Sequence, residues 1–136
     1  MTTSIEFTLN HQPCTIEIED GASVLEVLRD QCGILSPKDG CSPTGQCGCC
    51  TVIVDDRAVV SCAMPASKVA GKKILTVEGF SELERETFAD CFIAAGGLQC
   101  GFCTPGMIMR SHRVLKENPN PTGEEIRFRI GGNLCR

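Results

Sequence analysis

Eleven cysteines in 136 residues constrain this chain more than any other feature of its sequence. Most of them fall into two sets that are flanked by glycine. The sets are Cys41, Cys47, Cys50 and Cys62, and then Cys100, Cys103 and Cys135. Groups of three and four thiolates on tight loops are typical of iron–sulfur clusters. The pattern predicts a metal-binding chain that moves electrons, provided that disulfides and zinc are the weaker explanations of these cysteines.

Disulfides fit the sequence poorly. An odd number of cysteines cannot all pair within one chain. The residues that follow Met1 contain no basic stretch leading into an apolar one, and no later run is long enough to span a membrane. A cytoplasmic, reducing setting is therefore expected, where dense cysteines bind metal more often than they form disulfides.

The charge pattern argues against nucleic acid as a partner. The formal net charge is −4, and lysines and arginines form no continuous run. A phosphate backbone is usually bound by a basic stripe or patch, which is missing here. With 42% hydrophobic residues, the chain can build the core of one ordinary domain or of two small ones.

The first half has the period of β-strands around one short helix. Alternating apolar residues at 5–9 and 14–18 predict a hairpin with a turn at 10–13. Ser23 and Glu26 form a capping box that opens a helix over 23–29. Further strands are predicted at 51–54, 58–60 and 74–77, with a turn at 55–56. This order of elements is similar to the β-grasp arrangement of plant-type ferredoxins.

The second half has the period of helices. A helix is predicted from Ser81, with apolar residues on one face, and it should end at Gly96. A second helix should start with Thr104 as N-cap and Pro105 at the first helical position. Thr122 opens a third with another capping box. The predicted class is α+β, with residues 1–79 as one domain and 80–136 as a helical domain.

The spacing of the cysteines suits a bound cluster. The pairs Cys47/Cys50 and Cys100/Cys103 are both C-x2-C, which brings two sulfurs to one place. Neighbouring glycines let the backbone bend closely and point amide N–H groups at the sulfurs. Eleven residues separate Cys50 from Cys62, enough for a strand, a turn and a returning strand. The first set is therefore predicted to close one [2Fe-2S] centre, whereas zinc sites usually carry less glycine.

The other cysteines and both histidines are given structural roles. Cys14 and Cys91 lie on apolar faces and are predicted to be core residues, because free cysteine behaves as a small hydrophobe. Cys32 fits either core or surface, and Cys49 is interpreted as a bystander between two ligands. The two histidines, at positions 11 and 112, have no metal-ligand spacing to a partner.

With both sets in view, the chain resembles the small iron–sulfur subunit of the molybdenum hydroxylases, the family of xanthine dehydrogenase, carbon monoxide dehydrogenase and aldehyde oxidoreductase. The resemblance covers nearly the whole length. Residues 40–52 with Cys62 look like the ferredoxin-type cluster loop of that family. Residues 99–107 with 132–136 look like its second-cluster signature.

The resemblance implies a fold and a set of partners. It implies a β-grasp domain with the solvent-side cluster, followed by a four-helix bundle with a second [2Fe-2S] cluster near the molybdopterin, which Gln99 would contact. Molybdopterin and FAD would belong to a large and a medium partner subunit, in a dimer of heterotrimers. Electrons would pass from molybdenum through the second cluster and then the first to the flavin.

Two departures from the family pattern stand out. Five residues separate Cys41 from Cys47, where plant-type ferredoxins have four, so a local bulge is expected with Cys41 still a ligand. The family closes its second set with Cys-x-Cys, whereas this sequence stops at Arg136. The fourth ligand of the second cluster is thus absent from the sequence, and a truncated chain is the favoured explanation.

Two other functions compete with this interpretation. One is a free-standing ferredoxin-type electron carrier, against which the helical half with its second cysteine set argues. The other is a zinc-stabilised interaction module without a redox role, which would be colourless. No general acid, base or nucleophile is evident, so catalysis by the chain alone is not expected, and the residues do not indicate the substrate of the complex or its final electron acceptor.

Overall fold

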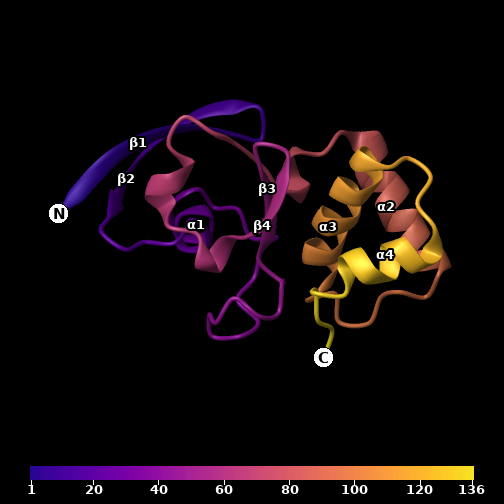
Figure 1. The fold of residues 1–136 in the computed structure, drawn as a ribbon. Helices are drawn as coiled ribbons and strands as arrows, with labels where there is room; N and C mark the ends of the chain where they lie inside the picture. The colour runs from indigo at the N-terminus through magenta and orange to yellow at the C-terminus, as the bar shows by residue number, and fades with distance from the viewer.

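The computed structural model describes all residues, 1–136, and shows a mixed β-sheet joined to a group of helices (Figure 1). The fold is α+β. The first half contains five strands, β1 (Thr2–Leu9), β2 (Gln12–Glu19), β3 (Thr51–Val54), β4 (Arg57–Val60) and β5 (Lys73–Leu75). Its helical segments are short, namely α1 (Val24–Glu26), η1 (Val27–Gln31), η2 (Ser61–Ala63), η3 (Ala66–Val69) and η4 (Val77–Gly79).

The sheet has the strand order β2-β1-β5-β3-β4. Strands β1 and β5 run parallel, with Thr8 opposite Lys73, and every other pair is antiparallel. A parallel pair needs a crossover connection. Here the crossover contains α1, η1, the cysteine loop and the β3–β4 hairpin, so the first cysteine set lies within it.

Both hairpins turn over two residues. Asn10 (φ 48°) and His11 (φ 70°) join β1 to β2, and Asp55 (φ 44°) and Asp56 (φ 66°) join β3 to β4. Two successive residues of positive φ match the right-handed twist of the strands. The longer turn expected at 10–13 is wrong at its end, because Gln12 and Pro13 already pair in the edge strand β2. Proline is tolerated there since an edge strand leaves one row of N–H groups unpaired.

The capping box at Ser23 is confirmed, but the helix that it opens is not regular. The Ser23 hydroxyl accepts from the Glu26 N–H (3.2 Å), and the Glu26 carboxylate accepts from the Ser23 N–H (2.7 Å). After three residues the helix widens into the π-helical turn η1, where the N–H of Cys32 reaches back to the carbonyl of Val27. The continuous α-helix predicted over 23–29 is therefore a short α-turn followed by a π-turn.

Loss of this cap should lower stability by a measurable amount. Ser23→Ala removes the hydroxyl and is expected to cost about 1 kcal/mol in the free energy of unfolding. The pKa of Glu26 is lowered because its carboxylate accepts from the N–H and hydroxyl of Ser23. Because the pKa of Glu26 is lower in the folded state, its carboxylate stabilises the fold at pH values above its unfolded pKa. This contribution of Glu26 is lost as the pH falls through the folded-state pKa. Urea titrations of Ser23→Ala at several pH values, with the exposed Ser4→Ala as control, measure both effects.

The main core lies between the sheet and the α1–η1 segment. Leu28 and Val52 are fully buried there (0% exposed), together with residues from β1, β2, η3 and β5. Cys14 and Cys32 are half-buried at its margin, so the predicted core role of Cys14 holds in part. Apolar burial of this kind is the dominant favourable term in folding.

The second half consists of α2 (Glu82–Ala94), α3 (Thr104–Glu117) and α4 (Gly123–Ile130). Ser81 and Thr122 cap α2 and α4 through their side chains, as predicted. Thr104, however, is the first residue of α3 rather than its cap, and Cys103 takes the cap position without a side-chain bond. The second capping box is also incomplete, because the Glu125 carboxylate accepts from the Asn118 side chain instead.

Strand β3 joins the two halves because both of its faces are buried. Val52 and Val54 face the main core, whereas Ile53 faces a second core that it forms with Phe80, Ile108 and Met109. Figure 1 shows the consequence, with α3 lying beside β3 and β4 and with α2 and α4 farther out. The domain boundary after residue 79 stays a prediction.

The prediction for Cys91 is wrong, since this residue is exposed on α2. No residue of α2 is fully buried, and Leu83 is 73% exposed. Only Phe88 and Phe92 of this helix pack against the second core. The apolar face that the periodicity identifies on α2 is therefore only partly covered, through Phe88 and Phe92. None of the helices has both the length and the apolar character needed to cross a membrane.

Candidate metal centre

The first cysteine set lies on the loop that precedes β3. Asp39 begins the loop, where its carboxylate accepts from the N–H groups of Cys41 (3.2 Å) and Ser42 (2.7 Å). The chain then passes through two left-handed residues, Ser42 (φ 75°) and Gly45 (φ 74°). Both fall within the five-residue spacer between Cys41 and Cys47, so this is where the loop accommodates its extra residue.

Backbone N–H groups point at the sulfurs of this loop. The N–H of Thr44 donates to Sγ of Cys41 (3.2 Å), and the N–H of Cys49 donates to Sγ of Cys47 (3.4 Å). The pKa of the Cys41 thiol is lowered to about 6 by the hydroxyl and N–H of Thr44 and by further N–H groups of the loop. Such donors stabilise a thiolate, which is the form that binds metal.

The remaining two thiols of the set are brought in by the β3–β4 hairpin. Cys50 lies directly before β3, and Cys62 lies in η2 directly after β4. The N–H of Cys62 donates to Sγ of Cys50 (3.4 Å). Burial and the neighbouring Cys50 thiol raise the pKa of Cys62 to about 12, and Cys41 adds to the shift. The structure therefore brings the four predicted residues of the first set together.

The second set comes from two distant segments. Cys100 and Cys103 precede α3, and Cys135 follows α4. The thiol of Cys103 contacts that of Cys135, and its pKa is raised by burial and then by Cys135 and Cys100. The structure thus brings all three predicted thiols of this set together.

Two thiols of the first set and all three of the second line one cavity of about 860 Å³. Six cysteines line it, three from the first loop and three from the second set, namely Cys41, Cys47, Cys49, Cys100, Cys103 and Cys135. Gln99 and Phe102 also line it, and Gln99 is exposed at its edge. Gln99 therefore lies beside the second set.

Cys49 lies between the two sets, where sequence reasoning treated it as a bystander. It is 4% exposed, and its Sγ is 3.9 Å from the carbonyl of Leu134. Burial, together with the neighbouring thiols of Cys47 and Cys103, raises the pKa of Cys49 to about 12. The buried Cys49 side chain therefore packs between the first loop and the Leu134 segment.

The donor set fits a [2Fe-2S] cluster better than a single ion. Zinc requires about four ligands around one point. No three His, Cys, Asp or Glu side chains gather around a single ion position. A binuclear cluster spreads its thiolates over two irons, and its sulfurs accept N–H bonds like those made to Cys41, Cys47 and Cys50.

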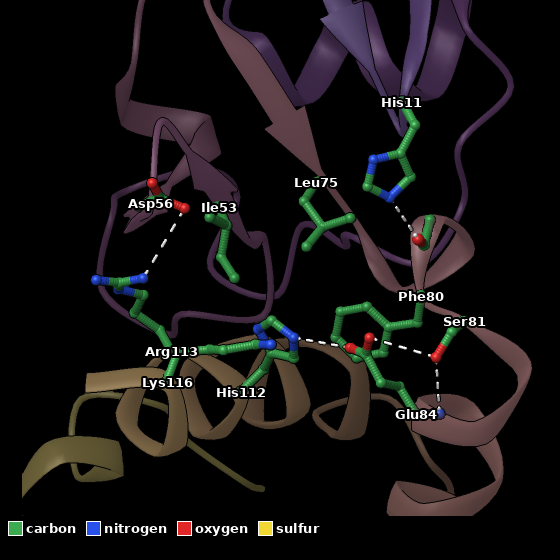
Figure 2. Close-up of a pocket in the computed structure, with 11 residues that line it drawn as sticks. His11, Ile53, Asp56, Leu75, Phe80, Ser81, Glu84, His112, Arg113 and Lys116 are labelled. Atoms are coloured by element: carbon green, nitrogen blue, oxygen red, sulfur yellow. Dashed lines mark hydrogen bonds and ion pairs between the residues drawn. The ribbon is translucent and has the colours of Figure 1, made fainter. Parts of the chain in front are cut away.

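A separate cleft of about 620 Å³ lies where the sheet meets the helices (Figure 2). His112 of α3 is buried at its base, where its ring stacks on Phe80 at 4.6 Å between centroids. The Nε2–H donates to the Glu84 carboxylate (2.8 Å), whereas Nδ1 is buried without a partner. His112 joins α3 to α2 through its bond to Glu84. No cysteine lines this cleft, so His112 lies apart from the candidate metal centre.

His112→Ala should weaken the packing of α3 against Phe80 and α2. The change removes the contact with Phe80 and the bond to Glu84, and we expect it to lower the free energy of unfolding by about 1–3 kcal/mol. Lys116→Ala, at the rim of the same cleft, is the matched control and should stay within about 0.5 kcal/mol. Urea unfolding followed by circular dichroism measures both variants, and equal stabilities would contradict the role given to His112.

Two family models match the chain. One, described as a 2Fe-2S iron-sulfur cluster binding domain, matches residues 7–93. The other, described as a [2Fe-2S] binding domain, matches residues 76–136. Between them the matches include every cysteine of both sets.

Named relatives match over almost the whole chain. The chain is 42% identical to the nicotinate dehydrogenase small FeS subunit of Eubacterium barkeri, covering 98% of this chain and 85% of that protein. It is also 42% identical to the xanthine dehydrogenase iron-sulfur-binding subunit of Escherichia coli O157:H7, covering 99% and 86%. Quinoline 2-oxidoreductase from Pseudomonas putida 86 has a chain of the same fold, with a TM-score of 0.91 and 36% identity over 99% of this chain and 83% of that one.

Proposed function

Because this chain belongs to the small iron–sulfur subunits of the molybdenum hydroxylase family, we propose that it relays electrons between a molybdopterin subunit and a flavin subunit. The observation that carries the proposal is that two sets of thiols, from distant parts of the sequence, each come together in the fold, and that members of both sets line one cavity. When bound, a [2Fe-2S] centre passes one electron at a time, whereas molybdenum and flavin chemistry moves two.

The ligands follow from the two sets. For the first cluster we propose Cys41, Cys47, Cys50 and Cys62, whose thiols meet at the loop before β3. For the second we propose the three thiols that meet between α3 and α4, which are Cys100, Cys103 and Cys135. A further thiol is needed to complete the second set.

The residues around the sulfurs set the environment of each cluster. The N–H groups of Thr44, Cys49 and Cys62 are placed to stabilise negative charge on the first set. Cys47 and Cys50 are buried, whereas Cys100 and Cys135 are exposed in the chain by itself. The exposed second set suits a site that a partner covers, since burial by a partner would exclude water from it.

Gln99 is proposed to contact the pterin of the large subunit. Its side chain is exposed at the edge of the cavity, next to Cys100. An amide both donates and accepts hydrogen bonds, which suits the polar edge of a pterin. This position would put the second set, rather than the first, beside the molybdenum site.

The fold of each half is also proposed in more detail. Residues 1–79 form a β-grasp domain of the plant-type ferredoxin kind, supported by the parallel β1–β5 pair and by α1 packed on the sheet. Residues 80–136 form part of a helical bundle, supported by α2, α3 and α4.

Large and medium partner subunits are proposed, in a dimer of heterotrimers. Exposed apolar side chains concentrate in the helical half, which is typical of a docking surface. They are Leu83, Ile93, Leu98, Phe102, Leu115, Phe128 and Leu134. A cytoplasmic location is proposed because none of the eleven cysteines is in a disulfide, which suits a reducing compartment.

Purification of the chain from its native source, with an affinity tag, tests the relay. We expect a large and a medium subunit to co-purify, with molybdenum, FAD and about four irons for each copy of this chain. A free-standing ferredoxin-type carrier is the weaker alternative, because relatives are named as subunits. Recovery of an iron-containing chain without partners would support that carrier, and recovery of a zinc protein would overturn both functions.

A further inference from the structure

The loop of the first set is hydrogen-bonded directly to the loop of the second. The N–H of Leu134 donates to the carbonyl of Cys47 (2.8 Å). The thiol of Cys49 lies 3.9 Å from the carbonyl of Leu134, on the other side of the same residue. Leu134 is the neighbour of Cys135, so these bonds run between residues of the two proposed cluster sites.

Asn133 adds a side chain to this contact. Its Nδ2 donates to the carbonyl of Gly48 (2.9 Å) and to Oγ1 of Thr51 (3.3 Å). The Thr51 hydroxyl in turn donates to the same Gly48 carbonyl (2.6 Å). The three groups form a closed network around the turn that carries Cys47 and Cys50. Asn133 is 7% exposed, so water competes little for these bonds.

The two loops are closely packed at Gly48 and Gly106, where no side chain larger than hydrogen fits without a shift. A Cβ on Gly48 would lie 2.9 Å from Nδ2 of Asn133, and one on Gly106 would lie 2.5 Å from the Gly48 carbonyl. Gly106 is in the first turn of α3, which begins directly after Cys103. The start of α3, the turn at Gly48 and the side chain of Asn133 are therefore in mutual van der Waals contact.

The amide of Asn133 is kept although it is only half satisfied. Its Oδ1 is buried without a partner. An unsatisfied buried acceptor lowers the stability of the fold, because it has lost its bonds to water and gained none in return. An apolar side chain would avoid that cost but would not donate to Gly48. Asn133 therefore holds the Gly48 turn in place at some loss of stability from its unpaired Oδ1.

We propose that Asn133 is a positioning residue that fixes the separation of the two cluster sites, by holding the Gly48 turn against the Cys135 segment. The inference rests on the proposed function, because it needs a cluster at each set. The same contact provides a chain of bonds from Cys135, through the Leu134 N–H, to the carbonyl of Cys47. A fixed distance between the two cluster sites matters because electrons would pass between clusters that do not move toward each other.

Pulsed electron paramagnetic resonance of the dithionite-reduced complex tests the proposal, since it reports the distribution of distances between two paramagnetic centres. We expect one narrow distribution for the wild type and a broadened or shifted one for Asn133→Ala. Asn118→Ala is the matched control, because it removes an exposed amide that bonds Glu125 (3.1 Å) between α3 and α4. The control variant should show the same distribution of distances as the wild type.

Thr51→Val covers the case in which Asn133→Ala fails to hold iron. It keeps the shape of the side chain in β3 and removes the hydroxyl that bonds both Asn133 and Gly48. A broadened distribution in Thr51→Val supports the proposal, and wild-type distributions in the variants that retain iron overturn it. A wild-type complex without two iron centres would instead refute the proposed function, so the two failures are distinguishable.

Discussion

Replacing Cys100 and Cys103 together with serine is expected to remove about half of the iron from the chain, with the other half unchanged. The expectation follows from the grouping of the thiols, since Cys103 interacts with Cys135 and Cys100, whereas Cys62 interacts with Cys50 and Cys41. Serine is a harder and less acidic ligand than cysteine and binds iron–sulfur clusters poorly. Iron and sulfide analysis of the purified complex, together with its visible spectrum, measures the loss.

The reciprocal variant, Cys47→Ser with Cys50→Ser, should remove the other half and leave the second set loaded. Cys91→Ser is the control, because this thiol is exposed on α2 and does not line the cavity of the two sets. It should keep all the iron. Loss of all the iron on replacement of either pair, in a chain that remains folded, would contradict the assignment of two independent sites.

Gly106→Ala is expected to destabilise the protein, although alanine normally favours a helix. In an open helix position the change would stabilise by roughly 1 kcal/mol. Here the new Cβ would lie 2.5 Å from the carbonyl oxygen of Gly48 and 3.1 Å from Cα of Cys49. Both are backbone atoms, so relief requires the cysteine loop to move. Overpacking of this kind typically costs about 1–3 kcal/mol, so we expect a net loss and a lower iron content in the first set.

Gly123→Ala is the matched control for this prediction. Gly123 is also in the first turn of a helix, α4, but its new Cβ would meet only the flexible end of Arg127 at 3.4 Å. We expect this variant to be neutral or slightly stabilising. Urea unfolding of both variants, with iron analysis of each, is the measurement. Equal stability of the two alanine variants would show that the close approach at Gly106 is not rigid.

The parts of the fold that follow local rules could be predicted from the sequence. The alternation around Phe7 and the capping serines at positions 23 and 81 depend on nearest neighbours, and each lies where the sequence indicates. The grouping of the proposed ligands was also predictable. C-x2-C spacing and flanking glycine restrict where a thiol can point, whatever the rest of the fold does.

The parts that depend on distant contacts could not be predicted. The π-turn at Val27 arises where the segment packs on the sheet, which a helical period does not indicate. Cys91 lies on an apolar face of α2, but the second core covers that face only at Phe88 and Phe92 and leaves Cys91 exposed. The role of Asn133 depends on Gly48, 85 residues earlier, and a single asparagine beside glycine gives no signal of such a partner.

Iron and acid-labile sulfide analysis of the purified wild-type chain in its complex, followed by electron paramagnetic resonance after dithionite reduction, tests the central claim most directly. The account predicts about four irons and four sulfides per chain and two distinct rhombic signals. A chain that contains zinc in place of iron, or that shows no sulfide and no signal on reduction, would contradict it.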